Sequence, residues 1–372
     1  MRIGIDARFY QEAGIGRYIR NLIKNLATLD SKNEYFIFLL DKNFDEVTLP
    51  KNFQKVRANF GWYGLQEQIK FPKLLRSYKL DLVHFPHFNI PIFYKGRFVV
   101  TIHDLIHQNF QMKRATTLNP IIYKIKKVGY DQVFNNAINN ASKILVPSNY
   151  VKDLLIEEWK LDKDRIVVTY EAVDGKIFSV EKIMKEEIID QVMNKYSIKQ
   201  PYIFYVGNAH PHKNVEGLIK AFLLLKNDYP NLKLYLAGHD HYFWQRIKQE
   251  YKDEGIVYKG YVNDRELIAL YKGARVFVMP SFDEGFGLPI LEAFAMGVPV
   301  VSSNSASLPE VGGDACIYFN PKDVTDMANK IKQVLDDKSL RQMLIEKGQQ
   351  RYKLFSWEKL ARTTLKIYEE SV

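Results

Sequence analysis

The sequence predicts an α/β protein with two halves, each built on a parallel sheet covered by helices. Apolar runs of strand length alternate with amphipathic helical patterns along the whole chain, which is typical of parallel sheets covered on both faces. At 372 residues the chain is also too long for one ordinary core. We therefore expect two domains.

Each half contains several apolar runs of strand length, separated by helical patterns such as residues 15–29. In the first half the runs are residues 2–8, 34–40, 81–85, 97–104, 143–148 and 165–172. In the second half they are residues 201–207, 232–238, 255–262, 275–281 and 298–303.

The domain boundaries are expected near the charged stretch 179–200, which begins where the first half ends and is the expected connector region. This predicts an N-terminal domain at 1–178 and a second domain at 198–355. The remaining segment, 356–372, carries a helical pattern, and we expect that helix to pack back on the N-terminal domain.

Composition indicates a folded protein with an anionic partner. The chain is 47% hydrophobic and carries a formal net charge of +10, which suits nucleic acid, an anionic membrane or a phosphorylated substrate. Cys316 is the only cysteine, so neither a disulfide framework nor a cysteine-based metal site is expected. No apolar run approaches the roughly 18 residues that span a bilayer, and the N-terminus has no signal-peptide pattern. These features favour the cytoplasm.

Two basic stretches interleave cations with large apolar residues. One is 65–79, and the other is 119–130, which contains Lys124, Lys126 and Lys127. Such interleaving suits the surface of an anionic membrane. An ordinary amphipathic helix would show the same pattern, so both interpretations stay open.

The segment PSFDEGFGLPILEAFAMGVPVV (280–301) predicts a strand end, a glycine-rich turn, a short helix and another strand. Pro289 suits the first helical position. A glycine-rich turn at a helix start offers free backbone N–H groups and the positive helix end to an anion. Glu284 and Glu292 flank this turn and would repel phosphate, so we expect them to accept hydrogen bonds from hydroxyl groups. The pattern fits a nucleotide sugar; two solvated glutamates near a helix start are the alternative.

The eight histidines fall in four close pairs, each at or just after the end of a predicted strand. Ligands of open α/β sheets bind beyond the carboxyl ends of the strands, so the pairs predict two ligand-facing surfaces. Zinc is the competing explanation, but no cysteine or acidic cluster completes a zinc site. The pairs are His84/His87, His103/His107, His210/His212 and His239/His241.

Two further turns follow predicted strands. EAGIGRY (12–18) places Gly14 and Gly16 where a ligand could approach the backbone, but it is not a dinucleotide fingerprint because Ile19 stands at the third glycine position. YVGNAHPHKN (205–214) precedes a predicted helix and contains Lys213, a cation well placed for phosphate.

Taken together, these motifs make nearly the whole chain resemble the GT-B retaining glycosyltransferases of family 4, which include bacterial mannosyltransferases of surface-polysaccharide assembly. EGFGLP with Glu284 and Glu292 eight apart resembles the family's E-x7-E element. AGIGRY resembles its first glycine-rich loop, TIHD (101–104) its central histidine element, and VGNAHPHKN its G-x5-K-N phosphate element. The resemblance implies two Rossmann-like domains whose parallel sheets face a central cleft.

The resemblance also implies roles for residues. His103, Lys213 and Glu284 would be catalytic: His103 against the donor sugar, Glu284 by its hydroxyls, and Lys213 on the diphosphate with the amides of Gly287 and Leu288. Glu292 would hold the ribose and Val262 would lie near the base. The residues that would bind the donor are Gly14, Gly16, Asn208, His212, Lys213, Val262, Glu284, Gly285, Phe286, Gly287, Leu288 and Glu292.

The implied reaction moves a hexose, with mannose favoured, from a nucleotide sugar to a glycan or lipid-linked acceptor. GDP-mannose is the favoured donor and a UDP-sugar the other candidate; no metal and no cofactor are expected. The sequence departs from the family at Asn208 and His212, where relatives often carry arginine, so one or two permanent charges are missing from the expected phosphate site. A sugar-nucleotide epimerase, a non-catalytic sugar-nucleotide-binding protein and a nucleic-acid-binding protein are the rival functions, the last lacking a recognition motif.

Overall fold

The computed structural model describes the chain except for residues 46, 107–119, 179–185, 197 and 199. His107 therefore lies outside the described residues. Within residues 120–126 only the backbone is described, so the side chains of Lys124 and Lys126 lie outside it as well. The described residues form two compact units. The first contains the described part of residues 1–105, 120–171 and 356–372, and the second contains Ile106 and the described part of 172–355.

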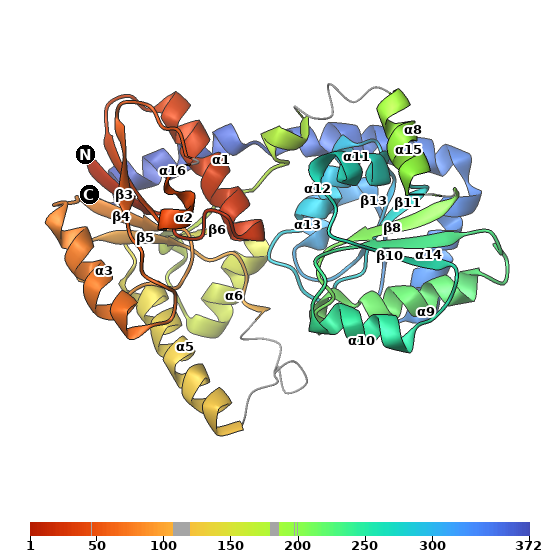
Figure 1. Ribbon diagram of the computed structural model, residues 1–372, viewed down its shortest axis with the longest axis horizontal. Coiled ribbons are helices and arrows are strands. Elements are labelled where there is room, and N and C mark those ends of the chain that lie inside the picture. Colours follow the sequence, from red (N-terminus) through yellow and green to blue (C-terminus); the bar gives the residue numbers. More distant parts are fainter. Residues whose placement is uncertain (46, 107–119, 179–185, 197, 199) are drawn as a thin grey trace. The chain divides into compact units, whose positions relative to one another are not determined.

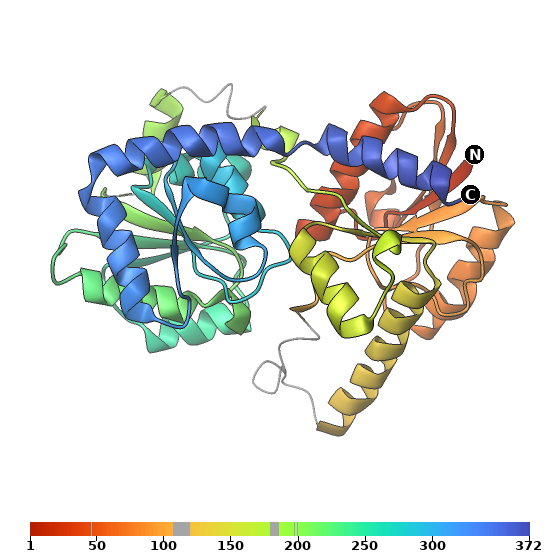
Figure 2. The ribbon, with the colours of Figure 1, turned by 180° about the vertical axis from the view of Figure 1, so that it is seen from behind.

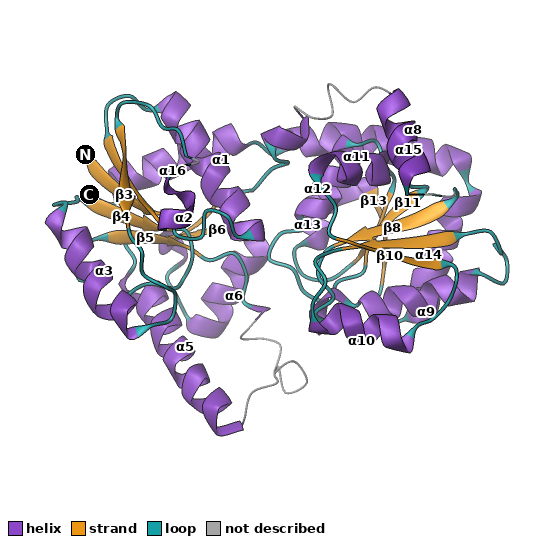
Figure 3. Cartoon of the chain, viewed as in Figure 1, coloured by secondary structure: helices purple, strands orange, loops and turns teal. Residues whose placement is uncertain are grey.

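The first unit is a parallel sheet of seven strands covered by helices (Figures 1 and 3). Its strand order is β3-β2-β1-β4-β5-β6-β7, so the chain runs outward in one direction from β1 and in the other from β4. The strands are β1 (Arg2–Asp6), β2 (Glu34–Leu39), β3 (Phe53–Arg57), β4 (Leu82–Phe85), β5 (Phe98–Thr101), β6 (Lys143–Val146) and β7 (Ile166–Val168).

The helices of the first unit bury their apolar faces on this sheet. Phe71, Phe85 and Phe134 are fully buried in one core. The last helix packs against α1 within the unit (Figure 2). The ring of Trp357 meets that of Tyr18 there, with centres 6.2 Å apart. The helices are α1 (Ala13–Leu29), α2 (Asp41–Phe44), α3 (Leu65–Ser77), α5 (Pro120–Asn140), α6 (Asn149–Trp159), the 3-10 turn η1 (Lys163–Arg165) and α16 (Trp357–Glu370).

The second unit repeats the arrangement with six parallel strands in the order β10-β9-β8-β11-β12-β13 (Figure 3). Its core is separate and includes Phe204, Phe277 and Ile290, all fully buried. The strands are β8 (Tyr202–Val206), β9 (Lys233–Ala237), β10 (Ile256–Gly260), β11 (Val276–Met279), β12 (Val300–Ser303) and β13 (Cys316–Phe319).

Capping side chains mark the starts of several helices in the second unit. Asn263 and Glu266 form a reciprocal capping box at the start of α11, and Asp323 caps α14. The helices are α8 (Glu186–Lys195), α9 (Val215–Leu225), α10 (Tyr242–Glu250), α11 (Asp264–Gly273), α12 (Leu288–Ala295), α13 (Leu308–Gly312), α14 (Val324–Asp336) and α15 (Lys338–Arg351), with 3-10 turns η2 (Pro211–Lys213), η3 (Gly313–Ala315) and η4 (Tyr352–Leu354).

The predicted fold class is confirmed: the chain is α/β with two parallel sheets. Two strands were not predicted, β3 and β13. Both lie at the edge of a sheet, where one side of the strand needs no apolar cover, and β3 (FQKVR) accordingly exposes Gln54 and Arg57. Among the described residues, no helix combines the length and the apolarity that a membrane crossing requires.

Candidate functional site

The second unit has a switch point in its sheet between β8 and β11. The strand order runs outward to β10 on one side and to β13 on the other, so β8 and β11 are the neighbouring strands at which the order reverses. In open α/β sheets, ligands bind at this point. The loop after β8 carries Lys213, and the loop after β11 carries Glu284.

Lys213 and Glu284 meet at this switch point. The Lys213 ammonium lies 2.7 Å from both carboxylate oxygens of Glu284, and Ser281 donates a hydrogen bond of 2.7 Å to one of them. The side chains of the pair are only 17% and 9% exposed. The two predicted catalytic residues of this unit, 71 positions apart, therefore form one polar cluster.

The loop after β8 is shaped by Tyr205 and Asn214. The Tyr205 hydroxyl donates to the carbonyl oxygen of Asn208. Burial, together with the negative charge of Glu284, raises the pKa of Tyr205, so this hydroxyl stays a donor. Asn214 adopts a left-handed conformation at the start of α9, and its amide donates to the carbonyls of Pro280 and Pro321. Tyr205 and Asn214 thus hold the backbone on both sides of Lys213.

His212 lies in the 3-10 turn between these supports. Its carbonyl oxygen accepts a 2.7 Å hydrogen bond from the amide of Phe282, which joins the loop after β8 to the loop after β11. Its ring stacks on that of His210, with ring centres 5.8 Å apart. The predicted donor residue Asn208 turns its side-chain oxygen toward the amide of His210.

Ser307 holds the backbone of the glycine-rich turn after β11. The Ser307 hydroxyl contacts the carbonyl oxygens of Glu284 and Phe286 at 2.8 and 2.7 Å. Gly287 has a φ of 113°, and a methyl group added there would lie 2.8 Å from a methyl of Leu308. A glycine is therefore required at the residue that caps α12.

The predicted donor residues of this turn differ in what they can offer. Phe286 is buried in the core and packs its ring against Phe355, and Leu288 packs partly on the same core. Phe286 could therefore reach a ligand only through its backbone groups, whereas Leu288 is half-buried. Gly285 and Gly287 lie in the same turn, which brings four of the predicted residues together with Glu284.

Glu292 lies on the buried side of α12, 3% exposed, and accepts a 3.0 Å hydrogen bond from the hydroxyl of Tyr271. Val262 follows β10, the edge strand, and is separated from β8 by β9. Its side chain packs partly on the core. Glu292 therefore lies within α12, after the turn that carries Glu284, and Val262 lies beyond β9 as seen from β8.

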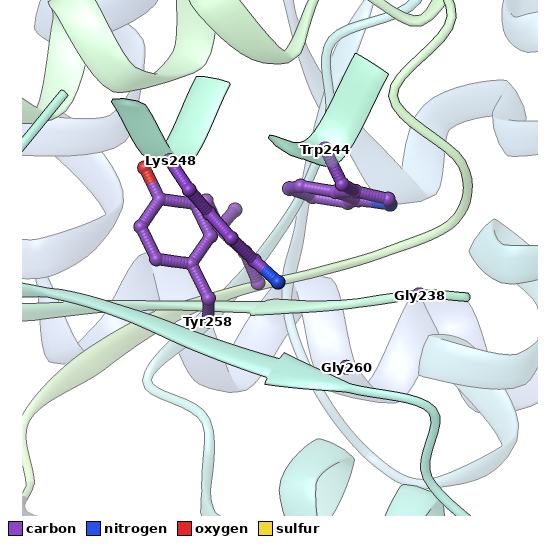
Figure 4. A pocket seen from close by; sticks show the side chains of 6 residues that line it. Gly238, Trp244, Lys248, Tyr258 and Gly260 are labelled. Atoms are coloured by element: carbon purple, nitrogen blue, oxygen red, sulfur yellow. The ribbon is translucent and has the colours of Figure 1, made fainter. Parts of the chain in front are cut away.

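The ends of β8, β9 and β10 approach each other closely. A methyl group added to Gly238 would lie 1.9 Å from the carbonyl oxygen of Gly207, so a side chain there would force the two strands apart. Beside Gly238, a small recess is lined by Leu236, Trp244, Lys248, Tyr258 and Gly260 (Figure 4). The rings of Trp244 and Tyr258 fill its walls, and none of the predicted site residues lines it.

His103, the third predicted catalytic residue, lies two positions after β5 in the first unit. One ring nitrogen is 3.0 Å from a carboxylate oxygen of Glu171 and the other is 2.9 Å from the carbonyl oxygen of Pro86. The edge of the ring meets Tyr18, with centres 4.9 Å apart. Sequence reasoning missed Glu171, because nothing in the strand pattern shows that it reaches His103.

Gly14 and Gly16 differ from the prediction. Both belong to the first turn of α1 and not to the loop before it, since the amide of Gly16 already bonds the carbonyl of Glu12. Gly16 is needed for packing, because an added methyl group would lie 2.5 Å from the carbonyl oxygen of Tyr10, whereas Gly14 faces open space.

His84, from the first histidine pair, is a core residue in β4 and does not face a ligand surface. Its two ring nitrogens lie 2.6 Å from the hydroxyl of Tyr368 and 2.8 Å from that of Thr101, which also meets the hydroxyl of Tyr18. Complete burial, with the charge of His103 as a lesser cause, lowers the pKa of His84 to about 3. It is therefore neutral in the folded protein.

Comparisons with known proteins agree with this architecture. Residues 13–176 match the family described as "Glycosyltransferase Family 4", and residues 188–351 match "Glycosyl transferases group 1". The chain is 33% identical to "O-antigen chain mannosyltransferase B" of Escherichia coli, covering 97% of both chains. It is 27% identical to "O-antigen chain mannosyltransferase RfbU" of Salmonella typhimurium, covering 73% of this chain and 70% of that protein.

Solved structures share the whole fold. The structure of Anabaena Alr3699/HepE in complex with UDP-glucose aligns with a TM-score of 0.76 at 14% identity, covering all of both chains. WaaG, "a glycosyltransferase involved in lipopolysaccharide biosynthesis", aligns with a TM-score of 0.74 at 14% identity, covering 99% of each. These likenesses show that the fold is GT-B. The chain belongs to the family 4 glycosyltransferases of the GT-B fold.

Proposed function

We propose that this chain is a metal-independent, retaining mannosyltransferase that uses a nucleotide sugar, GDP-mannose in preference to a UDP-sugar, in surface-polysaccharide assembly. The acceptor in this proposal is a glycan or a lipid-linked glycan. Mannose is favoured because relatives that align along most of this chain are named O-antigen chain mannosyltransferases.

The observation that carries the proposal is the cluster of Lys213, Glu284 and Ser281 at the β8/β11 switch point. Ser281 and Glu284 lie in the loop that leads through Gly287 into α12. Breaking a sugar–phosphate bond places negative charge on the departing diphosphate. Lys213 and the amides at the start of α12 would stabilise that charge where it develops. Glu284 would then exchange part of its contact with Lys213 for the hydroxyls of the donor sugar.

The same arrangement supports the proposed metal independence. A fixed ammonium and a helix start can neutralise a diphosphate without a divalent cation. Among the described residues, no group of three or more histidine, cysteine, aspartate and glutamate side chains is arranged to hold a metal ion. Retention would follow from attack on the face that the diphosphate leaves.

We further propose that the first unit works at the inner membrane face, in contact with anionic lipid. Helix α3 exposes Leu65 (80%) and Ile69 (50%), and Lys70, Lys73 and Arg76 are exposed on the same helix. An apolar stripe flanked by cations suits an anionic bilayer surface. This surface is here called the α3 patch. In the other basic stretch, Lys127 pairs with Asp131 at 2.9 Å, so its charge is partly neutralised and offers less to an anionic lipid.

The test is a transfer assay with the purified chain, GDP-mannose or UDP-glucose as donor, and a lipid-linked glycan acceptor, with and without EDTA. We expect mannose transfer that EDTA does not inhibit and a product whose NMR coupling shows the anomeric configuration of the donor. Glu284→Gln should abolish transfer, and Glu254→Gln, which removes an exposed carboxylate from the same unit, should not. Conversion of the donor without acceptor would instead indicate an epimerase, and an inverted product would refute retention.

A further inference from the structure

Glu171 and Pro86 engage both nitrogens of the His103 ring. Nδ1 faces Glu171 Oε1 at 3.0 Å and Nε2 faces the Pro86 carbonyl oxygen at 2.9 Å. A carbonyl oxygen only accepts hydrogen bonds, so Nε2 carries a proton. A neutral ring has one proton, and Nδ1 would then turn a lone pair toward a carboxylate. A second proton between Nδ1 and Glu171 removes that repulsion.

The surroundings favour this second proton on the ring. The side chains of His103 and Glu171 are 15% and 8% exposed, and burial alone would lower the pKa of His103. The hydrogen bond and charge of Glu171, the Pro86 carbonyl and the charge of Asp104 together outweigh burial and raise it. Among the described residues, two further groups near the ring are neutral: Tyr18, whose ring meets it, and His84, on which His103 acts as a like charge.

We infer that Glu171 is a positioning residue: with the Pro86 carbonyl it fixes the His103 ring in one orientation as an imidazolium, so that neither ring nitrogen can take a proton from the acceptor. This inference rests on the proposed function, together with the place against the donor sugar that the family resemblance implies for His103. Glu171 is also the residue after which the chain passes from the middle segment of the first unit into the second unit.

A protonated His103 changes how the protons of the reaction are assigned. The acceptor oxygen forms a bond to the anomeric carbon as the bond from that carbon to the diphosphate breaks, and the acceptor proton must leave. Because His103 has no free lone pair, that proton passes to an oxygen of the departing diphosphate. His103 contributes a fixed, positively charged ring.

The direct test is NMR of the full chain with 15N-labelled histidine, in which the signals missing from His103→Gln identify His103. We expect both ring nitrogens of His103 to stay protonated from pH 6 to pH 8 in the wild type. In Glu171→Gln the ring loses its opposite charge, and we expect it to lose one proton within that range. Glu158→Gln removes an exposed carboxylate of the same unit and should titrate as the wild type does.

Turnover of the same proteins gives the second measurement. The kcat of the wild type and of Glu158→Gln should change less than about twofold between pH 6 and pH 8. The kcat of Glu171→Gln should fall about tenfold over that range, because the charged fraction of a titrating ring falls about tenfold per pH unit above its pKa.

Loss of a His103 ring proton in the wild type below pH 8, or the same titration in Glu171→Gln as in the wild type, would overturn the inference. Wild-type turnover by His103→Gln would also overturn it, because a ring that the reaction does not need requires no positioning. Failure of every donor to react would refute the proposed function, while the NMR titration would still decide the protonation of His103.

Discussion

Replacing His84 with glutamine should make the first unit less sensitive to acid. In the folded chain His84 is completely buried between two hydroxyl groups, and its pKa is lowered from 6.5 to about 3, chiefly by burial. In the unfolded chain the ring takes up a proton below its ordinary pKa. Between these two values the unfolded state binds more protons than the folded state, so stability falls as the pH falls.

The size of the effect follows from the two pKa values. At pH 5, which is 1.5 pH units below the ordinary value of 6.5, the linkage removes about 2 kcal/mol of unfolding free energy, since each unit is worth about 1.36 kcal/mol. The loss continues until the pH reaches the folded value, so the upper limit is roughly 4–5 kcal/mol. Above pH 7 the contribution of this group is constant.

The assay is denaturant unfolding at pH 5 and pH 7.5, followed by tryptophan fluorescence. The chain has four tryptophans, and Trp244 is the one in the second unit, so a Trp244→Phe background reports on the first unit alone. In that background we expect the parent to lose about 2 kcal/mol more than His84→Gln between the two pH values. His239→Gln, which changes an exposed histidine of the second unit, should behave as the parent does.

An equal loss in His84→Gln and its parent would refute the reasoning. It would mean that His84 is protonated in both states or in neither, and that the contacts with Tyr368 and Thr101 do not keep it neutral. The comparison does not depend on the absolute stability of the variant, because carboxylates that titrate in the same range contribute equally to both proteins.

The remaining predictions concern the donor site and the α3 patch. Lys213→Ala should reduce kcat by more than a hundredfold at unchanged far-UV dichroism, since one charge-stabilising contact is worth about 3–4 kcal/mol of barrier; near-normal turnover would remove its proposed role. Gly287→Ala should lower the unfolding free energy by about 1–3 kcal/mol, measured in urea, because its φ of 113° strains any other residue. Donor affinity should weaken from pH 6 to 8.5 in the wild type, because His212 loses the positive charge that it offers the diphosphate. In His212→Arg the affinity should not weaken, because arginine stays charged. If calorimetry gives both proteins the same change of affinity with pH, His212 is not part of the phosphate site. Leu65→Gln with Ile69→Gln should weaken sedimentation with anionic vesicles, and equal binding to neutral vesicles would contradict the proposed lipid contact.

The parallel sheets could be predicted because their central strands are buried on both faces and therefore appear in the sequence as continuous apolar runs. The same reasoning found the edge strands β7 and β10 but missed the edge strands β3 and β13. β3 alternates buried and exposed residues, and β13 is four residues long and half-buried in its middle. β3 and β13 each bury only two residues, and in β3 these stand beside Gln54, Lys55 and Arg57, so no continuous apolar run marks that strand.

The donor site could be predicted only in part. Its motifs are short stretches of sequence, whereas the side chains that hold its loops in place come from distant parts of the chain. Glu284 and Lys213 were found through their glycine-rich and histidine-rich loops. Ser307, which holds the carbonyls of the Glu284 turn, lies 23 positions further along the chain in an unremarkable sequence. Asn214 lies beside Lys213, yet its task of binding the carbonyls of Pro280 and Pro321 depends on contacts 66 and 107 residues away.

His84 and His103 show why charge could not be assigned from sequence. Both follow the same kind of apolar run and lie in neighbouring strands of one sheet or just beyond them. His84 is held by two hydroxyls, one of them from a residue 284 positions away, and is neutral. His103 is held by a carboxylate 68 positions away, which favours its charged form. Each state supports the other: a charged His103 disfavours a second cation nearby, so a neutral His84 can lie in the core behind it without opposing the charge that Glu171 maintains.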